Sequence, residues 1–301
     1  MSASDSTDRD ETRSGIVAGL IAYSLWGVFP VYFKIIESVA PTEVLAHRIV
    51  WAVPFGALIL LFRRQWPEVR RALTDRTTVS WLALSALFIT VNWFIYIWAV
   101  QNARIFETSL GYYINPLMYV FVGVLFFGER LRSLQLAAVI FASVGVLVLT
   151  LSGGTFPWVA ISLAVFFTAY GVIRKRVAIG AMPGLFVETV LLFPFAMVWM
   201  TWLLVAGQAS FSTQDMSLAM LLLAAGPITV VPLLLFAVAA RRLPLTMIGF
   251  MQFLAPTLQL LTGIYYGEKL TTAHQICFGL IWVAVILFSV DAIRAGRKKA
   301  A

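Results

Sequence analysis

The residues that could do chemistry in this sequence are a few polar side chains inside long apolar segments. Arg48 lies about six residues into one of them, and an arginine at the centre of a membrane span costs about 3 kcal/mol, so it usually faces a cavity or a partner. Arg48 is predicted to anchor an anionic or carbonyl group of a substrate. The alternatives are a structural ion pair, with Glu107 as the candidate partner, or an extension toward the outer membrane interface.

Glu188 is the acidic residue in the equivalent position of a later apolar segment, 140 residues after Arg48. A buried carboxylate can carry a coupling proton across the membrane. An ion pair with Arg241 or Arg242, at the end of a neighbouring segment, explains the same residue without transport. Both interpretations are open at the level of sequence.

Polar side chains with aromatic or amide groups recur at helical spacing in two further segments. Asn92 and Tyr96 are four residues apart, and Tyr112 and Asn115 are three apart, so each pair shares one helix face. Such a mixture suits an organic ligand of mixed polarity. Hydrogen bonds between helices, or positions at the membrane interface, are the alternatives.

The later part of the chain offers analogous polar residues and two prolines of interest. Gln252 and Gln259 are seven residues apart on one helix face, and we include them with Arg48 and the two pairs above in a predicted substrate-binding set. Pro116 and Pro256 each free a backbone carbonyl inside an apolar segment. They are predicted to act as hinges or as static kinks.

Neither catalysis nor metal binding is indicated by any motif. His47 and His274 are isolated, without a second metal-type ligand at helical spacing. The phosphate-binding G-x-x-x-x-G-K-[ST] and the hydrolase motifs H-E-x-x-H and G-x-S-x-G do not occur. We therefore expect a protein that is not an enzyme and has no cofactor, metal or catalytic residue. A membrane enzyme acting on lipid-linked substrates is the weakest alternative.

The segments that position these residues belong in a membrane. Hydrophobic residues make up 61% of the 301 residues and charged residues 12%, whereas soluble domains have about a quarter charged residues. Runs that are apolar all round for about twenty residues predict helices rather than the alternating strands of a β-barrel. The expected fold is an all-α multi-pass membrane protein. Its ten transmembrane helices are predicted at 15–34, 42–62, 79–100, 106–126, 132–152, 157–173, 183–206, 216–239, 244–266 and 271–292.

The distribution of basic residues predicts the orientation. With the N-terminus inside, 18 of the 22 lysines and arginines fall in cytoplasmic segments, three fall outside, and Arg48 lies within a span. Basic residues accumulate in cytoplasmic loops, so both termini are expected in the cytoplasm of a bacterial inner membrane. This also explains the net charge of +8 without a nucleic-acid partner.

Weak internal repeats divide the chain into two halves. Gly128-Glu129-Arg130-Leu131 is matched by Gly267-Glu268-Lys269-Leu270, and Pro54 by Pro194, at offsets of 139 and 140. Because each half holds five spans, the second must be inverted relative to the first, as in many secondary transporters. The expected organisation is a disordered cytoplasmic tail at 1–14, repeats at 15–152 and 157–293, and a basic tail at 294–301.

Three motifs resemble a known family, together with the Gly-Glu-basic-Leu turn before the last helix of each half. They are His47-Arg48-Ile49-Val50-Trp51, Asn92-Trp93-x-x-Tyr96-Ile97-Trp98-Ala99-Val100 and Leu110-Gly111-Tyr112-Tyr113-Ile114-Asn115-Pro116-Leu117. The chain is similar in them to the EamA-type drug/metabolite transporters and, more narrowly, to their RarD subgroup. The resemblance implies a ten-helix inner-membrane carrier that exports or exchanges small metabolites or drugs. It implies neither a specific substrate nor a set of binding residues.

The expected function is therefore secondary transport by alternating access, with export favoured and with protons or substrate exchange as the driving force. A channel or a non-transporting membrane scaffold is the alternative. The expected partners are a small-molecule substrate and the lipid bilayer. Gly15-x-x-x-Gly19 and Gly263-x-x-x-Gly267 fit either a homodimer or packing within the chain.

Overall fold

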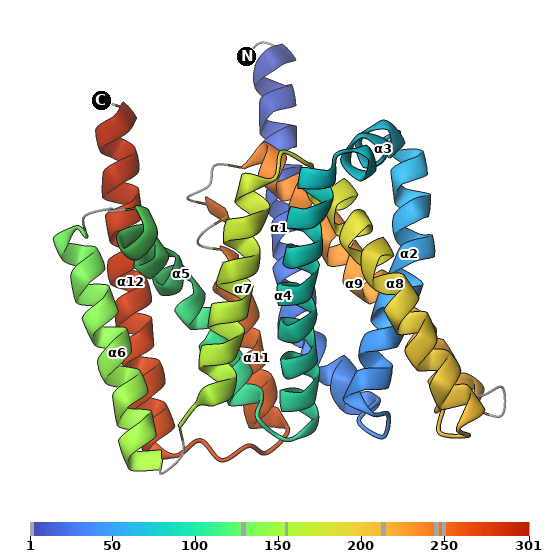
Figure 1. Ribbon diagram of the computed structural model, residues 1–301. Helices are drawn as coiled ribbons and strands as arrows, with labels where there is room; N and C mark the ends of the chain where they lie inside the picture. Colours follow the sequence, from blue (N-terminus) through green and yellow to red (C-terminus); the bar gives the residue numbers. More distant parts are fainter. Residues whose placement is uncertain are drawn as a thin grey trace.

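The long apolar segments form helices in the computed structural model (Figure 1). It describes residues 3–127, 131–153, 156–211, 215–243, 247–248 and 251–300. Eleven helices and no strand are found within these residues. They are α1 (Ala3–Ile35), α2 (Pro41–Phe62), α3 (Trp66–Thr74), α4 (Arg76–Gln101), α5 (Ile105–Phe127), α6 (Ser133–Gly153), α7 (Trp158–Arg176), α8 (Ala181–Val205), α9 (Met216–Arg242), α11 (Leu254–Tyr265) and α12 (Thr272–Ala300).

Eight of these helices are long and apolar enough to cross a membrane: α1, α2, α4, α6, α7, α8, α9 and α12. They coincide with eight of the ten predicted spans. A ninth prediction, 106–126, falls on α5, which has 23 residues. The tenth prediction, 244–266, is matched by α11, which has 12 residues. Residues 244–246 and 249–250 of this prediction lie outside the described part. The turn residues Gly128, Glu129 and Arg130 lie outside it as well.

Two features differ from the sequence-based expectation. Helix α1 begins at Ala3 and includes most of the segment 1–14, which was expected to be disordered. A polar segment adds to a helix at low cost when the adjoining span has already met the cost of nucleation. Helix α3 was not expected because it is short and polar. It buries Val69 and Ala72, three residues apart, and exposes Arg70 and Arg71.

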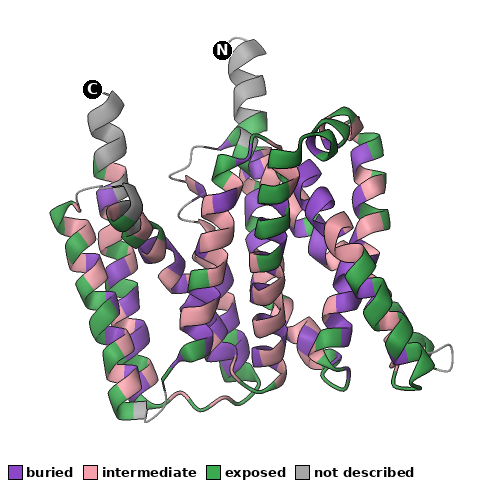
Figure 2. Cartoon of the chain, in the orientation of Figure 1, coloured by how far each residue is buried: buried purple, intermediate pink, exposed green. Residues whose placement is uncertain are grey.

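The two halves of the chain are packed into each other rather than side by side. Helices α6 and α12 form the most extensive contact, at one end of the bundle (Figure 1). Otherwise α1 packs against α9 and α11, α2 against α8 and α9, α4 against α7, and α5 against α7 and α11. Figure 2 shows buried residues concentrated between the central helices and exposed residues along α6 and the end of α8. Exposed residues there include apolar ones such as Leu151 and Val205, as expected of a surface that faces lipid.

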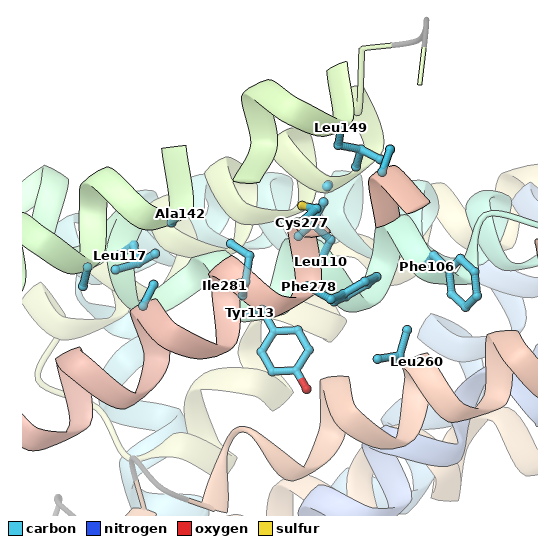
Figure 3. Packing of buried hydrophobic residues seen from close by; sticks show 14 residues of the cluster. Phe106, Leu110, Tyr113, Leu117, Ala142, Leu149, Leu260, Cys277, Phe278 and Ile281 are labelled. Atoms are coloured by element: carbon cyan, nitrogen blue, oxygen red, sulfur yellow. The ribbon is translucent and has the colours of Figure 1, made fainter. Parts of the chain in front are cut away.

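The contact between α6 and α12 is sealed by a large apolar cluster to which α5 and α11 also contribute (Figure 3). Its labelled members are Phe106, Leu110, Tyr113, Leu117, Ala142, Leu149, Leu260, Cys277, Phe278 and Ile281. Arg132 and Asp291 form an ion pair of 3.0 Å between the start of α6 and the far end of α12. These contacts join α6, near the middle of the sequence, to α12 at its end.

Three of the four glycines in the two G-x-x-x-G motifs lie in helices, and all three face neighbouring segments of the same chain. A Cβ added at Gly15 would lie 2.8 Å from Cβ of Arg242, and one at Gly19 would lie 2.7 Å from Sδ of Met251. A Cβ at Gly263 would lie 2.7 Å from the ring of Phe106. These three glycines therefore allow close approach between helices of one molecule.

The N-terminus of α4 is capped by Asp75, which gives a first prediction. Its carboxylate accepts hydrogen bonds from the Thr78 hydroxyl at 2.5 Å and from the backbone N–H groups of Thr77 and Thr78 at 3.1 and 3.2 Å. These bonds lower the pKa of Asp75, so the stabilisation is present above the ordinary carboxyl pKa and is lost as the pH falls through the lowered value. Asp75→Ala is expected to lower the thermal midpoint at pH 7 and to flatten its acid dependence. Asp75→Asn, which keeps an acceptor, should retain the midpoint at pH 7, and an Asn variant as unstable as the Ala variant would contradict the capping role.

Candidate functional site

Arg48 lies on the buried face of α2 and is 4% exposed. Its Nε donates a hydrogen bond to Oγ1 of Thr229 on α9 at 3.1 Å. Thr229 in turn donates to the carbonyl of Ala225, one turn earlier, at 2.8 Å, so its lone pairs are directed to the guanidinium. The contact between α2 and α9 therefore orients the arginine.

Aromatic side chains from two other helices surround the guanidinium. Its central carbon lies 4.5 Å from the ring centroid of Trp93 on α4 and 5.6 Å from that of Phe33 on α1. The side chains of Tyr32, Tyr96 and Tyr112 also lie near it. Cation–π contacts of this kind are worth about 2 kcal/mol when desolvated. They offset part of the cost of burying the charge without neutralising it.

No carboxylate of the described residues lies within 4 Å of Arg48. The candidate partner Glu107 instead pairs with Arg104, at 3.2 Å and three residues away, because both residues lie at the same turn at the start of α5. The alternative of an Arg48–Glu107 ion pair is therefore wrong. The only hydrogen bond that Arg48 makes with the described part of the chain is the one from Nε, which leaves its two amino groups for another acceptor.

Some of the polar side chains predicted on α4 and α5 lie beside the aromatic side chains around Arg48. The rings of Tyr96 and Tyr112 are 5.8 Å apart, and the Tyr112 hydroxyl donates to Oδ1 of Asn92 at 3.4 Å. Nδ2 of Asn92 donates to the carbonyl of Leu163 on α7 at 3.0 Å. The Tyr96 hydroxyl and Oδ1 of Asn115 are buried without a hydrogen-bond partner among the described residues. Asn92 thus positions Tyr112, while Tyr96 presents a free hydroxyl.

The two glutamines lie elsewhere. Gln259 is buried, donates from Nε2 to the carbonyl of Trp26 at 3.2 Å, and accepts from the Thr108 hydroxyl at 3.5 Å. It therefore joins α11 to α1 and α5, and neither contact reaches Arg48. Gln252 is half-buried, and its backbone N–H bonds to the carbonyl of Ile248. The structure does not gather the predicted substrate-binding set into a single contact group.

The prolines occupy different positions in their helices. Pro116 lies in the middle of α5, where it frees a backbone carbonyl as expected. Pro256 is the third residue of α11, in the first turn, where a missing N–H costs no helical hydrogen bond. Pro256 thus lies near the start of a described helix rather than in its middle, and its role as a hinge or static kink stays a prediction. Its own carbonyl accepts a hydrogen bond from the Ser109 hydroxyl of α5 at 2.7 Å.

Glu188 forms a second polar cluster, on α8. It is fully buried, and its Oε1 accepts a hydrogen bond from the Ser85 hydroxyl of α4 at 2.6 Å. Nε of Arg174, on α7, lies 3.6 Å from the same oxygen, and the side chain of Tyr170 also lies close to this carboxylate. Oε2 of Glu188 and Nη1 of Arg174 are buried without partners among the described residues.

The partner of Glu188 was not among the predicted ones. Arg242 donates to the Ser14 hydroxyl at 2.5 Å instead, and the side chain of Arg241 lies outside the described part. Arg174 belongs to the basic run 174–176, whose position in a predicted cytoplasmic segment gives no sign that one of its members pairs with a buried glutamate. Thr229, Phe33, Tyr32 and Ser85 were missed because spacing along one helix does not reveal contacts between helices.

Comparisons with known proteins agree with this architecture. Residues 13–151 match the EamA-like transporter family. A RarD protein of Salmonella typhi is 42% identical over 293 residues, which cover 97% of this chain and 100% of that protein. An uncharacterized transporter of Pseudomonas aeruginosa is 45% identical over 95% of this chain and 96% of that protein.

Two further matches widen the comparison. A protein of Pseudomonas aeruginosa named chloramphenicol-sensitive protein RarD is 32% identical over 95% of this chain and 97% of that protein. A solved crystal structure has a TM-score of 0.60 at 20% identity and covers 92% of this chain and 98% of that chain, which shows a shared fold. The protein has the apolar helices of a multi-pass membrane protein, and its curated relatives include proteins named as transporters. The chain therefore belongs to the EamA-like transporter family, among the RarD proteins.

Proposed function

We propose that this protein is a secondary transporter of the bacterial inner membrane that moves small metabolites or drugs, with export as the favoured direction. Both termini face the cytoplasm in this proposal, as the distribution of basic residues predicts. The start of α1 and the end of α12 lie on the same side of the bundle (Figure 1), which supports an even number of crossings. Ten helices in two inverted repeats, 15–152 and 157–293, alternate access to a central site.

The packing of the helices supports the inverted repeat. The proposed counterparts are α1 and α7, α2 and α8, α4 and α9, α5 and α11, and α6 and α12. Exchanging counterparts turns the α1–α9 contact into α7–α4, and the α1–α11 contact into α7–α5. The pairs α2–α8, α5–α11 and α6–α12 are exchanged with themselves. All of these contacts are present, as a twofold axis in the membrane plane requires.

Three glutamates near the ends of helices accept hydrogen bonds between the two proposed repeats. Glu43 of α2 accepts from the backbone N–H and hydroxyl of Ser210 at 2.7 and 2.8 Å. Glu268 accepts from the N–H groups of Ile105 and Phe106 at 2.5 and 2.9 Å. On the opposite side Glu68 accepts from the N–H of Gly180 at 2.6 Å. Breaking the bonds on one side at a time would open the central site to that side.

Arg48 is the single observation that carries the proposal. A buried cation without a counter-ion is costly, and among the described residues its contacts are aromatic rings and one hydrogen bond to a hydroxyl. An ion pair within the fold would serve a structural role at lower cost. A binding site that is completed by a polar group of the substrate explains the arrangement better.

The test is counterflow in proteoliposomes. A panel of metabolites and drugs is first screened for thermal stabilisation of the purified protein, with Arg48→Ala in parallel. A stabilising compound preloaded inside the vesicles should then accelerate uptake of the same labelled compound. Passage without such acceleration would indicate the channel alternative, and no passage at all would indicate the scaffold.

Glu188 is the proposed site of proton coupling, and this gives a second prediction. The titratable and charged groups that face it are Arg174 and Tyr170 of α7, while α4 contributes the Ser85 hydroxyl. The other elements packed against α8 contribute no ion pair or hydrogen bond to it within the described residues. A proton on Oε2 would leave Arg174 without its counter-charge and so alter the α7–α8 contact.

Glu188→Gln is expected to reduce uphill transport driven by a pH gradient by at least tenfold while leaving counterflow within about threefold, because exchange needs no net proton movement. Both rates are measured in the same proteoliposomes. The matched control is Glu107→Gln, which removes a carboxylate that is also paired with an arginine but is only partly buried, and which should leave both rates unchanged. Retention of gradient-driven transport by the Glu188 variant would leave substrate exchange as the driving force.

A further inference from the structure

We infer that the Arg48 site takes an organic monocarboxylate with a planar apolar group and without a cationic group. This inference rests on the proposed function and names the substrate class of the same site. It follows from three features: the unused hydrogen-bonding edge of the guanidinium, the aromatic side chains around it, and the engagement elsewhere of the buried glutamates of α2 and α8.

The guanidinium has a free edge of the geometry that a carboxylate requires. Nε is held by Thr229, and the two amino groups make no hydrogen bond with the described residues. Two parallel N–H groups match the two oxygens of a carboxylate, and such bidentate pairs are shorter and stronger than neutral hydrogen bonds. The Tyr96 hydroxyl, which is buried without a partner among the described residues and belongs to a side chain near Arg48, is a further donor for the same anion.

The aromatic side chains define the rest of the ligand. The Trp93 ring covers the guanidinium at 4.5 Å, so an anion approaches in the plane of the guanidinium rather than onto that face. Phe33, Tyr96 and Tyr112 form a continuous row, in which the ring centroids of neighbours are 5.8 Å apart. Rings offer edge-to-face and stacked contacts to another flat apolar group.

The acidic residues exclude a cationic group on the ligand. Among the described residues, the buried glutamates of α2 and α8 are already engaged: Glu43 with Ser210, and Glu188 with Ser85 and Arg174. An ammonium group beside Arg48 would add a second positive charge in a poorly solvated site. The site therefore discriminates against amines and against zwitterions such as amino acids.

The experiment compares four probes of similar size on the full-length protein in nanodiscs at pH 7. They are 3-phenylpropanoate, 3-phenylpropanamide, 2-phenylethylamine and phenylalanine, with acetate as a carboxylate that lacks the ring. Binding is measured by quenching of tryptophan fluorescence and by the shift of the thermal midpoint. The wild-type protein should bind 3-phenylpropanoate at least tenfold more tightly than each of the other four compounds.

Variants assign the preference to the site. Arg48→Gln should abolish the difference between the carboxylate and the amide, and Arg48→Lys, which keeps the charge but not the fork of donors, should weaken carboxylate binding about tenfold. Tyr96→Phe, which keeps the ring, should weaken it about fivefold. Equal binding of the carboxylate and the amide, tighter binding of the amine or the zwitterion, or binding of none of the four by the wild-type protein would overturn the inference.

The outcomes also separate this inference from the proposed function. Arg48-dependent binding of the neutral amide together with counterflow would retain the carrier and reject the substrate class. Arg48-dependent binding of the carboxylate without counterflow would retain the substrate class and reject the carrier. The probe series on the wild-type protein requires no variant, so a variant that fails to fold does not prevent a decision.

Discussion

Replacing Arg48 with alanine is expected to reduce counterflow of any substrate of this protein at least 30-fold. Truncating one partner of a buried, hydrogen-bonded charge pair costs about 2 to 5 kcal/mol, and the lower limit corresponds to a factor of about 30. The measurement is the initial rate in proteoliposomes that contain equal amounts of folded protein. The physical reason is that the fold places no other described cation in contact with Trp93 and Phe33.

Arg104 provides the matched control for this prediction. It is also an arginine that lies over aromatic rings, at 5.5 Å from Trp98 and 5.8 Å from Trp158. It differs in having a carboxylate partner, Glu107, and a side chain that is 38% exposed. Arg104→Ala should keep counterflow within about threefold of the wild-type rate, and an equal loss in both variants would show that arginine–aromatic contacts in general are required.

A substitution at Arg48 is also expected to change stability, and there the expected effect is a gain, whereas the expected effect on transport is a loss. Because Arg48 is buried and no carboxylate of the described residues pairs with it, Arg48→Met is expected to raise the thermal midpoint of the ligand-free protein while abolishing transport. Replacing buried charges by apolar groups of similar volume is often neutral or stabilising by about 1 to 4 kcal/mol. A clear fall in the midpoint would mean that the arginine serves the fold through its bond to Thr229. Stability and function thus distinguish the two roles of this residue.

Replacing Gly226 with alanine is expected to destabilise the protein by about 3 kcal/mol, because overpacking at a close contact costs about 1 to 3 kcal/mol and more where the neighbour cannot move. A Cβ at Gly226 of α9 would overlap the backbone carbonyl oxygen and carbon of Trp51 on α2. A backbone carbonyl inside a helix cannot turn away as a side chain can. The free energy of unfolding is measured by denaturant titration in mixed micelles.

Gly279→Ala is the matched control. Gly279 lies in α12, and a Cβ there meets nothing within 4 Å, so its replacement should be neutral or stabilising by up to about 1 kcal/mol because alanine favours helix. Gly226 is three residues before Thr229, so its replacement should also displace the acceptor of Arg48 and weaken ligand binding. Equal effects of the two substitutions on unfolding would contradict the close contact between α2 and α9.

Helix content was predictable because the signal is local. A run that is apolar all round for about twenty residues has to satisfy its backbone within the segment, which only a helix allows in lipid. Eight predicted spans therefore coincide with helices long and apolar enough to cross. The helix α3 and the extension of α1 to Ala3 were not predicted, because both segments are polar. The start of α1 is helical because it continues an apolar span, and α3 is helical because its apolar side chains pack against neighbouring helices.

Arg48 and Glu188 were recognisable for a related reason. A charged residue inside an apolar segment can be identified without knowing which face of the helix it occupies, so the sequence alone indicated both residues. Their partners were not recognisable. Glu107 and Arg242 were plausible from their positions along the chain, but the structure pairs them with Arg104 and Ser14.

Hydropathy, charge and spacing by themselves determined that this protein is a multi-pass helical membrane protein with Arg48 and Glu188 inside its spans, because each of these properties is written in consecutive residues. Only the tertiary structure decided what surrounds those residues. Thr229 lies 181 residues from Arg48, and Ser85 lies 103 residues from Glu188. Which helix faces meet depends on the close packing of side chains from distant segments, and that packing places Arg48 among aromatic rings, apart from every carboxylate of the described residues.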